Sequence, residues 1–70
     1  MDISKVIDKE YQGKSFKELA AAPVSALRGL SESDAKLLKE AFNVTSVRDL
    51  AELKYGKWAC AIATLADDEA

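Results

Sequence analysis

Residues 26–38 have the sequence ALRGLSESDAKLL, and this stretch decides the fold. Apolar residues lead into Gly29, one further apolar residue follows, and Ser31 precedes a helical stripe that begins at Ala35. Glycine commonly ends a helix, and Ser31 with Asp34 three residues later forms a capping-box pattern. The stretch therefore predicts two helical segments joined by a tight hairpin.

Apolar residues also recur at helical spacing between the hairpin and the N-terminus. A first helix is expected after Asp2 as its N-cap, and Gly13 interrupts it. Ser15 with Glu18 is another capping-box pattern, and Pro23 suits the first turn of a further short helix. The residues expected to face inward are Ile3, Val6, Ile7, Tyr11, Phe16, Leu19, Ala20, Val24, Ala26 and Leu27.

The same period continues after the hairpin. The helix that follows Ser31 should end at Asn43 in the left-handed conformation, with Val44 as the apolar contact of a Schellman cap. Ser46 caps the next helix, and Gly56 breaks the chain before a final helix. The residues expected to be buried in this half are Ala35, Leu38, Ala41, Phe42, Val47, Leu50, Ala51, Leu53, Trp58, Ile62 and Leu65, with Leu37 beside them.

Length and composition indicate one globular domain. The chain has 70 residues, 49% of them hydrophobic and 31% charged, which is too apolar for a disordered protein. No alternating run predicts a strand. We expect an all-α fold: a compact bundle of about five short helices over residues 1–66, followed by a frayed acidic tail at residues 67–70.

The charge balance argues against a purely electrostatic nucleic-acid binder. The net charge is −2, from ten basic and twelve acidic residues, and three of the acids lie in the tail, so residues 1–66 carry ten bases and nine acids. Proteins that hold nucleic acid by charge show a clear positive excess. This chain has none.

The residue types also limit the chemistry. With one cysteine and no histidine, the chain has no internal disulfide, no zinc-site pattern and no catalytic constellation. Cys60 is expected to be a packed, inert thiol. The N-terminal residues lack the apolar core of a signal peptide, and no apolar run approaches membrane-spanning length. We therefore expect a cytoplasmic protein that is not an enzyme, with no catalytic residue, cofactor, metal or membrane contact.

A short internal repeat allows two interpretations. Residues 15–20 (SFKELA) match residues 46–51 (SVRDLA) in character at each position. The repeat is either a duplicated helical unit around a shared core or the common pattern of any short capped helix.

Residues 24–53 resemble the helix-hairpin-helix family. Leu27, Gly29, Leu30 and Ala35 match its hydrophobic–Gly–hydrophobic–Gly hairpin and the alanine that follows, but the second glycine is Ser31 here. The resemblance implies that hairpin amides could hold a phosphate here, as they do in DNA-binding members of the family. The candidate contacts would be Arg28, Gly29, Leu30, Ser31, Lys36 and Lys39. The chain as a whole is similar to small prokaryotic proteins built on this helical unit.

These observations lead to two hypotheses about the function, from different classes. A self-capping Ser31 and the acids Glu32 and Asp34 favour a structural hairpin, so the first hypothesis is an interaction module that binds a protein partner or a second copy of itself. Its candidate partner surface comprises Arg28, Tyr55, Lys57 and the tail acids. The alternative is a weak, sequence-independent nucleic-acid binder that uses the backbone of residues 29–31.

Overall fold

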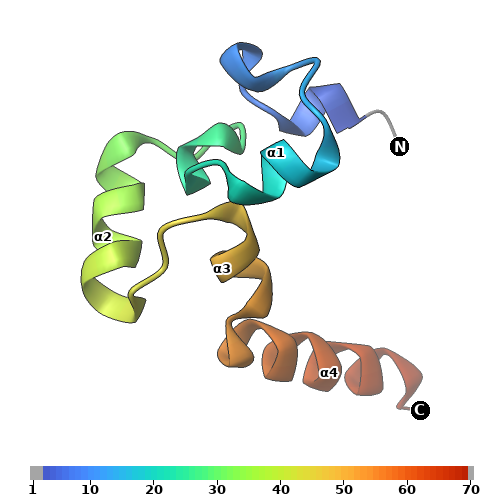
Figure 1. Cartoon of the computed structure of the whole chain (residues 1–70). Coiled ribbons are helices and arrows are strands. Elements are labelled where there is room, and N and C mark those ends of the chain that lie inside the picture. Colours follow the sequence, from blue (N-terminus) through green and yellow to red (C-terminus); the bar gives the residue numbers. More distant parts are fainter. Residues whose placement is uncertain (1–2, 70) are drawn as a thin grey trace.

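The computed structural model describes residues 3–69, which form four α-helices and three 3-10 turns without a strand (Figure 1). The all-α prediction is therefore confirmed. In chain order, the elements are η1 (Ile3–Val6), η2 (Lys9–Tyr11), α1 (Phe16–Ala21), η3 (Val24–Ala26), α2 (Glu32–Phe42), α3 (Val47–Glu52) and α4 (Lys54–Asp68), where η denotes a 3-10 turn.

The predicted first helix is wrong, because η1 and η2 take its place. Around Ile7 the backbone bonds to a distant segment instead of continuing a helix. The Asp8 amide donates to the Ala26 carbonyl at 2.7 Å, and the Arg28 amide donates to the Val6 carbonyl at 2.8 Å. The N-terminal segment is thus tied to the chain just before the hairpin. Asp2, the expected cap, lies outside the described residues.

The three predicted capping boxes are confirmed at the starts of α1, α2 and α3. In each, the serine hydroxyl accepts from the amide three residues later, and the acid there accepts from the serine amide. The predicted left-handed residue at the end of α2 is present too, but its hydrogen bonds are those of a simple αL cap and not of a Schellman cap. Asn43 has φ 57°, its amide donates to the Lys39 carbonyl at 3.0 Å, and the Val44 amide donates to the Leu38 carbonyl at 3.4 Å.

The two copies of the short repeat become α1 and α3, which are six residues each and pack against one another. The Val47 amide donates to the Ala22 carbonyl at 2.9 Å, and Pro23 pairs with Ser46 in an isolated antiparallel bridge. The core lies beside this junction. Within residues 3–69, the buried hydrophobic residues are Ile7, Ala22, Val24, Ala26 and Val44.

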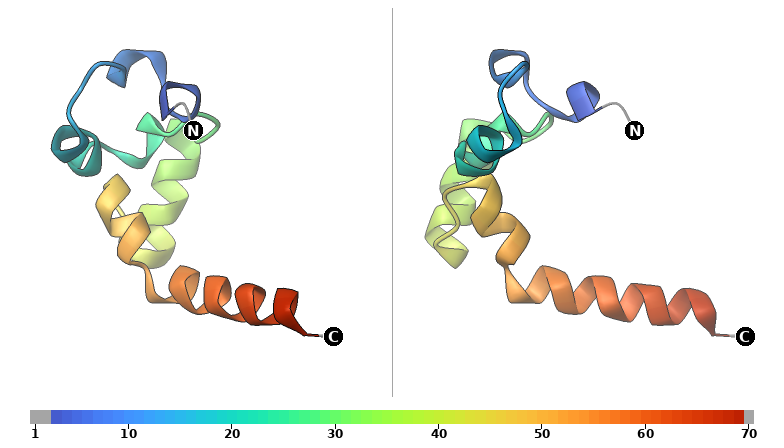
Figure 2. Two further views of the ribbon diagram at one scale, coloured as in Figure 1. Left: turned by 90° about the vertical axis from the view of Figure 1, so that its right-hand side faces the viewer. Right: turned by 45° about the vertical axis from the view of Figure 1, so that its right-hand side comes forward.

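The last helix, α4, differs most from expectation. Gly56 does not break the chain; the break falls at Leu53, with ψ 115°, and α4 runs from Lys54 through Gly56 to Asp68. Asp67 and Asp68, assigned to a tail, are therefore helical. The views in Figures 1 and 2 agree that α4 extends away from the rest of the molecule.

The burial predicted for several apolar residues is wrong. Every described residue of α4 is exposed, Trp58 included, because α4 leaves the body directly after Leu53. On α2, Ala35 and Leu38 are only half-buried, since no helix lies over the rest of that face. Further residues that were expected in or beside the core but are exposed are Ile3, Val6, Phe16, Leu37, Ala41, Phe42 and Ala51.

Candidate functional site

An apolar surface follows one side of α4. Tyr55, Trp58, Ile62 and Leu65 succeed one another at intervals of three or four residues, which places them on one face of a helix. We call these four residues the α4 face. Trp58 is 57% exposed, Ile62 69% and Leu65 67%. Clustered exposure of large apolar side chains, unlike isolated exposure, marks an interaction site.

Aromatic contacts hold the start of this face against the end of α2. The ring of Tyr55 lies 6.1 Å from that of Phe42 and 5.5 Å from that of Trp58, the second pair in an edge-to-face arrangement. The Lys54 ammonium lies 5.2 Å from the Tyr55 ring centroid and 5.6 Å from that of Trp58. The rings position α4 but leave Trp58 open to solvent.

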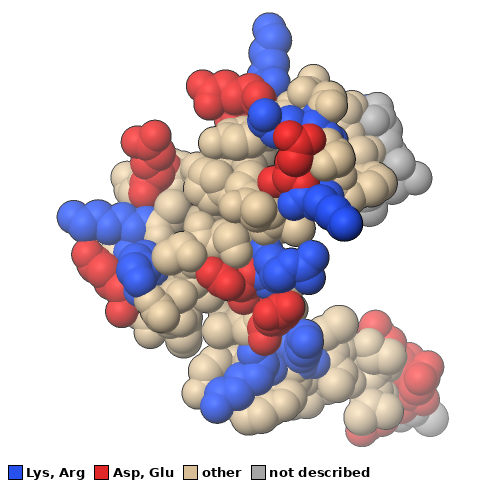
Figure 3. All heavy atoms as spheres, viewed as in Figure 1, with Lys and Arg blue, Asp and Glu red and all other residues tan. Residues whose placement is uncertain are grey.

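The helix α4 lacks the local stabilisation that the other helices have. Each of α1, α2 and α3 begins with a capping box and an acid in its first turn. The helix α4 has no side-chain cap, no acid in its first turn and no base in its last. Its lysines lie near its start and its acids at its far end (Figure 3). Lysines at the N-terminal end of a helix and acids at its C-terminal end both interact unfavourably with the helix dipole.

The whole molecule is more open than a chain of its size needs to be. Its radius of gyration is 13.9 Å, against about 11 Å for a compact domain of 70 residues. Its accessible surface is 5566 Å², against about 4,300 Å² for a folded monomer of 7.6 kDa. The extended α4 accounts for this openness in Figure 2.

The three residues predicted to form a partner surface do not lie together. Tyr55 and Lys57 are in the first turn of α4, beside the end of α2 where Phe42 lies. Arg28 precedes the start of α2, and its guanidinium donates to the Ile7 carbonyl at 3.5 Å. Because α2 is about 16 Å long, it separates Arg28 from the other two.

Gly29 adopts the expected left-handed conformation, and the amides of Leu30 and Ser31 are already bonded. Gly29 has φ 100°, in the left-handed region. The Leu30 amide donates to the Leu27 carbonyl at 3.1 Å, and the Ser31 amide donates to Asp34 Oδ2 at 2.9 Å. The Asp34 amide donates to Ser31 Oγ at 3.1 Å. A phosphate at residues 29–31 would have to displace the Asp34 carboxylate.

An acidic hollow beside the hairpin was not foreseen from the sequence. It has a volume of about 240 Å³, and Asp8 and Glu10 line it together with Leu30, Ser31 and Glu32. The Lys39 ammonium donates to the Asn43 side chain at the opposite end of α2, and Lys36 is exposed on α2. No local signal links Asp8 to a hairpin some twenty residues away. These carboxylates raise the electrostatic cost of placing a phosphate here.

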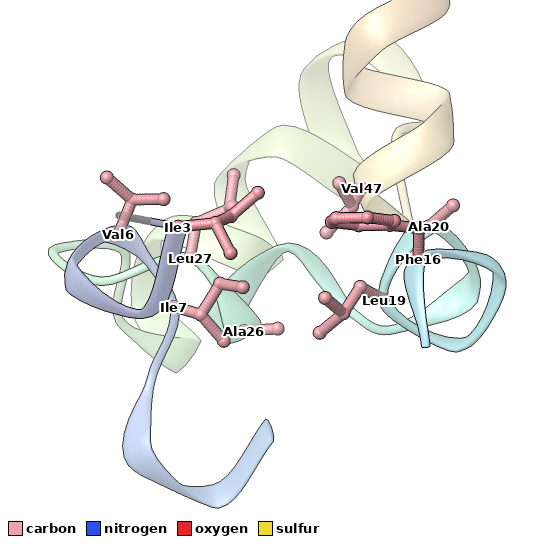
Figure 4. Close-up of a pocket in the computed structure, with 9 residues that line it drawn as sticks. All are labelled: Ile3, Val6, Ile7, Phe16, Leu19, Ala20, Ala26, Leu27 and Val47. Atoms are coloured by element: carbon pink, nitrogen blue, oxygen red, sulfur yellow. The ribbon is translucent and has the colours of Figure 1, made fainter. Parts of the chain in front are cut away.

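A second hollow is apolar and lies between η1 and α1 (Figure 4). Its volume of about 190 Å³ is below the roughly 300 Å³ at which small-molecule sites begin. None of its lining side chains is ionisable: Ile3, Val6, Ile7, Phe16, Leu19, Ala20, Ala26, Leu27 and Val47. It offers apolar contact and no acid–base chemistry.

The remaining candidates give little. Cys60 is exposed on α4 instead of packed, and the Thr64 hydroxyl donates to its carbonyl at 2.9 Å. In the described part of the chain, no group of three or more histidine, cysteine, aspartate or glutamate side chains is placed to hold a metal ion. Within residues 3–69, no helix combines the length and the apolarity that crossing a bilayer requires.

Comparison of the chain with protein-family models, curated proteins and solved structures finds no match.

Proposed function

We propose that this protein is a non-enzymatic interaction module and that a protein partner covers the α4 face. One observation carries the proposal: a helix of fifteen residues displays Trp58, Ile62 and Leu65 on one side while all of its residues are exposed. Isolated helices of about 12–15 residues are marginal in water. A partner that buries the α4 face would add the stabilisation that α4 lacks on its own.

The energetics support a binding role. Full burial of a large apolar side chain contributes about 1.5–3 kcal/mol, and the side chains of the α4 face are between 50% and 69% exposed. Tryptophan and tyrosine are frequent anchors of interfaces, because their rings bury a large area at low cost in side-chain entropy. Lys54 and Lys57 would form a polar rim beside Tyr55 and Trp58.

Site-specific photo-crosslinking in cells tests the proposal. A photoreactive phenylalanine analogue replaces Ile62 on the α4 face in one variant, and Cys60 on the opposite side of the helix in the matched control. We expect one discrete cross-linked species from position 62 and little from position 60. Equal cross-linking from both positions, or none from position 62, would contradict the proposal.

A further inference from the structure

We infer that the α4 face binds the α4 face of a second copy, with the two helices antiparallel and a two-fold axis beside Ile62. This inference rests on the proposed function and names its partner. An interface of this kind is isologous, so one face must complement itself. Three features of α4 meet that condition: the order of its charges, the order of its apolar residues, and its small residues.

The charges are complementary only when the helices run in opposite directions. Lys57 and Asp68 are eleven residues apart, about three full turns, so they lie on the same flank of α4. In an antiparallel two-fold pair each flank meets itself with its direction reversed. Lys57 then lies beside Asp68 of the second copy, and Lys54 beside Glu69 of the second copy. A parallel pair would set lysine against lysine.

The helix dipole points to the same arrangement. In α2 the acids Glu32 and Asp34 lie at the start and Lys39 lies in the last turn, as the dipole favours. In α4 this order is reversed, and the reversal costs stability as long as the helix is alone. Beside an antiparallel copy, the lysines of one helix face the acids and the negative helix end of the other. The pair therefore removes a penalty that the single helix carries.

The apolar residues fit the same register. When Ile62 lies beside Ile62 of the second copy, Trp58 lies opposite a position that is one residue from Leu65 of the second copy. The side chains of Trp58 and Leu65 are then neighbours across the interface. The aromatic contacts from Phe42 to Tyr55 and from Tyr55 to Trp58 would then be extended by an apolar side chain of the other chain. On the flank away from Lys57, the small residues Ala59 and Ala66 leave room beside the α4 face for the second helix.

The area to be covered matches a dimer. The accessible surface of 5566 Å² exceeds that of a typical monomer of this mass by about 1,300 Å². A standard interface buries about 800 Å² on each partner. The excess is large enough for one such interface, and the charge order of α4 selects a second copy to provide it.

The first test measures the association of the full chain by analytical ultracentrifugation over a concentration series. We expect a monomer–dimer equilibrium. Ile62→Asp should weaken it at least about a hundredfold, because a carboxylate would be buried at the two-fold axis. The matched control, Cys60→Asp, changes the side of α4 directly opposite the α4 face and should leave the dissociation constant within about threefold. Circular dichroism shows whether each variant still folds.

The second test determines the orientation. Lys57→Glu and Asp68→Lys should each weaken the dimer about tenfold, and the double variant should restore it. Each single change improves the match of α4 to its own dipole, so lost helicity cannot explain weaker association. Lys36→Glu on α2 is the charge control. Single changes that leave dimerisation unaltered or strengthen it would contradict the antiparallel pair.

The outcomes separate this inference from the proposed function. A chain that stays monomeric at every concentration, or a dimer that Ile62→Asp does not weaken, overturns the antiparallel pair. If position 62 then still cross-links in cells to a species whose mass is not twice that of the chain, the interaction module stands with a different partner. If position 62 cross-links to nothing, both proposals fail together.

Discussion

The side chains of Ser31 and Asp34 close a reciprocal cap at the start of α2. Ser31 Oγ accepts from the Asp34 amide at 3.1 Å, and Asp34 Oδ2 accepts from the Ser31 amide at 2.9 Å. The same two bonds satisfy the amides at the helix start and place a negative charge where the helix dipole favours it. This cap links the stability of the hairpin to pH, and it occupies the Ser31 amide that an anion at the hairpin would need.

The caps make the stability of the fold sensitive to acid. Hydrogen bonds from the amide and hydroxyl of Ser31 lower the pKa of Asp34 below its usual 3.8. The amide and hydroxyl of Ser15 likewise lower the pKa of Glu18, and for Asp49 the hydroxyl of Thr45 contributes most to a lowered pKa. A lowered carboxyl pKa stabilises the folded state above the unfolded pKa, and this contribution is lost as the pH falls through the folded pKa.

We therefore expect the melting temperature to fall steadily from about pH 5 to about pH 2. Thermal unfolding followed by circular dichroism measures it. Asp34→Asn, which cannot ionise, should be less stable at neutral pH and should show a smaller decrease on acidification. An identical acid profile in that variant would show that the Asp34 cap does not contribute.

The hairpin should bind nucleic acid weakly or not at all. The amides of Leu30 and Ser31 are bonded to Leu27 and to Asp34, and the hollow beside the hairpin carries Asp8 and Glu10. We expect a short DNA duplex at low salt to produce no localised amide shifts at residues 29–31 in NMR spectra of the labelled protein. Salt-sensitive shifts there would instead support the nucleic-acid hypothesis, with Arg28→Glu as the variant that should remove them.

Two glycines should respond in opposite ways to substitution by alanine. A Cβ would meet no atom within 4 Å at Gly29 or at Gly56, so steric contact distinguishes neither. Gly29 has φ 100°, and Gly29→Ala should cost about 1–2 kcal/mol in unfolding free energy through backbone strain alone. Gly56 lies inside α4, and Gly56→Ala should increase its helicity, with a gain of up to about 1 kcal/mol.

Urea unfolding and the ellipticity at the helix band measure both changes. A Gly29→Ala variant as stable as the parent would mean that the hairpin backbone relaxes freely. A loss of helicity in Gly56→Ala would mean that Gly56 is needed for a close contact on α4.

Burial should decide the cost of truncating an apolar side chain to alanine more than residue size does. Val24 is 1% exposed, the lowest value in the core together with Ala26. Val24→Ala should destabilise the fold by about 2 kcal/mol. Leu37→Ala removes more atoms, but Leu37 is exposed on α2, and its loss should cost less than about 0.5 kcal/mol. Denaturant unfolding compares them, and equal costs would contradict the placement of the core.

The sequence by itself determined the helix caps and the hairpin turn of this protein. The three serine caps, the left-handed Asn43 with Val44 behind it, and the turn at Gly29 are set by residues at most six positions apart, whose side chains bond to nearby backbone. The all-α class follows from the same patterns. At the N-terminus the local pattern misled, because the backbone beside Ile7 bonds to Ala26 and Arg28 instead of forming a helix.

Only the tertiary structure decided which apolar faces are covered. The periodicity of Trp58, Ile62 and Leu65 shows that α4 has an apolar side. The same pattern fits a helix packed against the core and a helix whose apolar side is exposed. The direction of the chain at Leu53 makes that choice, since it carries α4 away from the core. Burial depends on where distant segments lie, and the acidic hollow that Asp8 forms beside the hairpin depends on the same long-range arrangement. Caps are local and burial is not, so the sequence revealed the capped helices, whereas the packing of distant segments left the α4 face exposed.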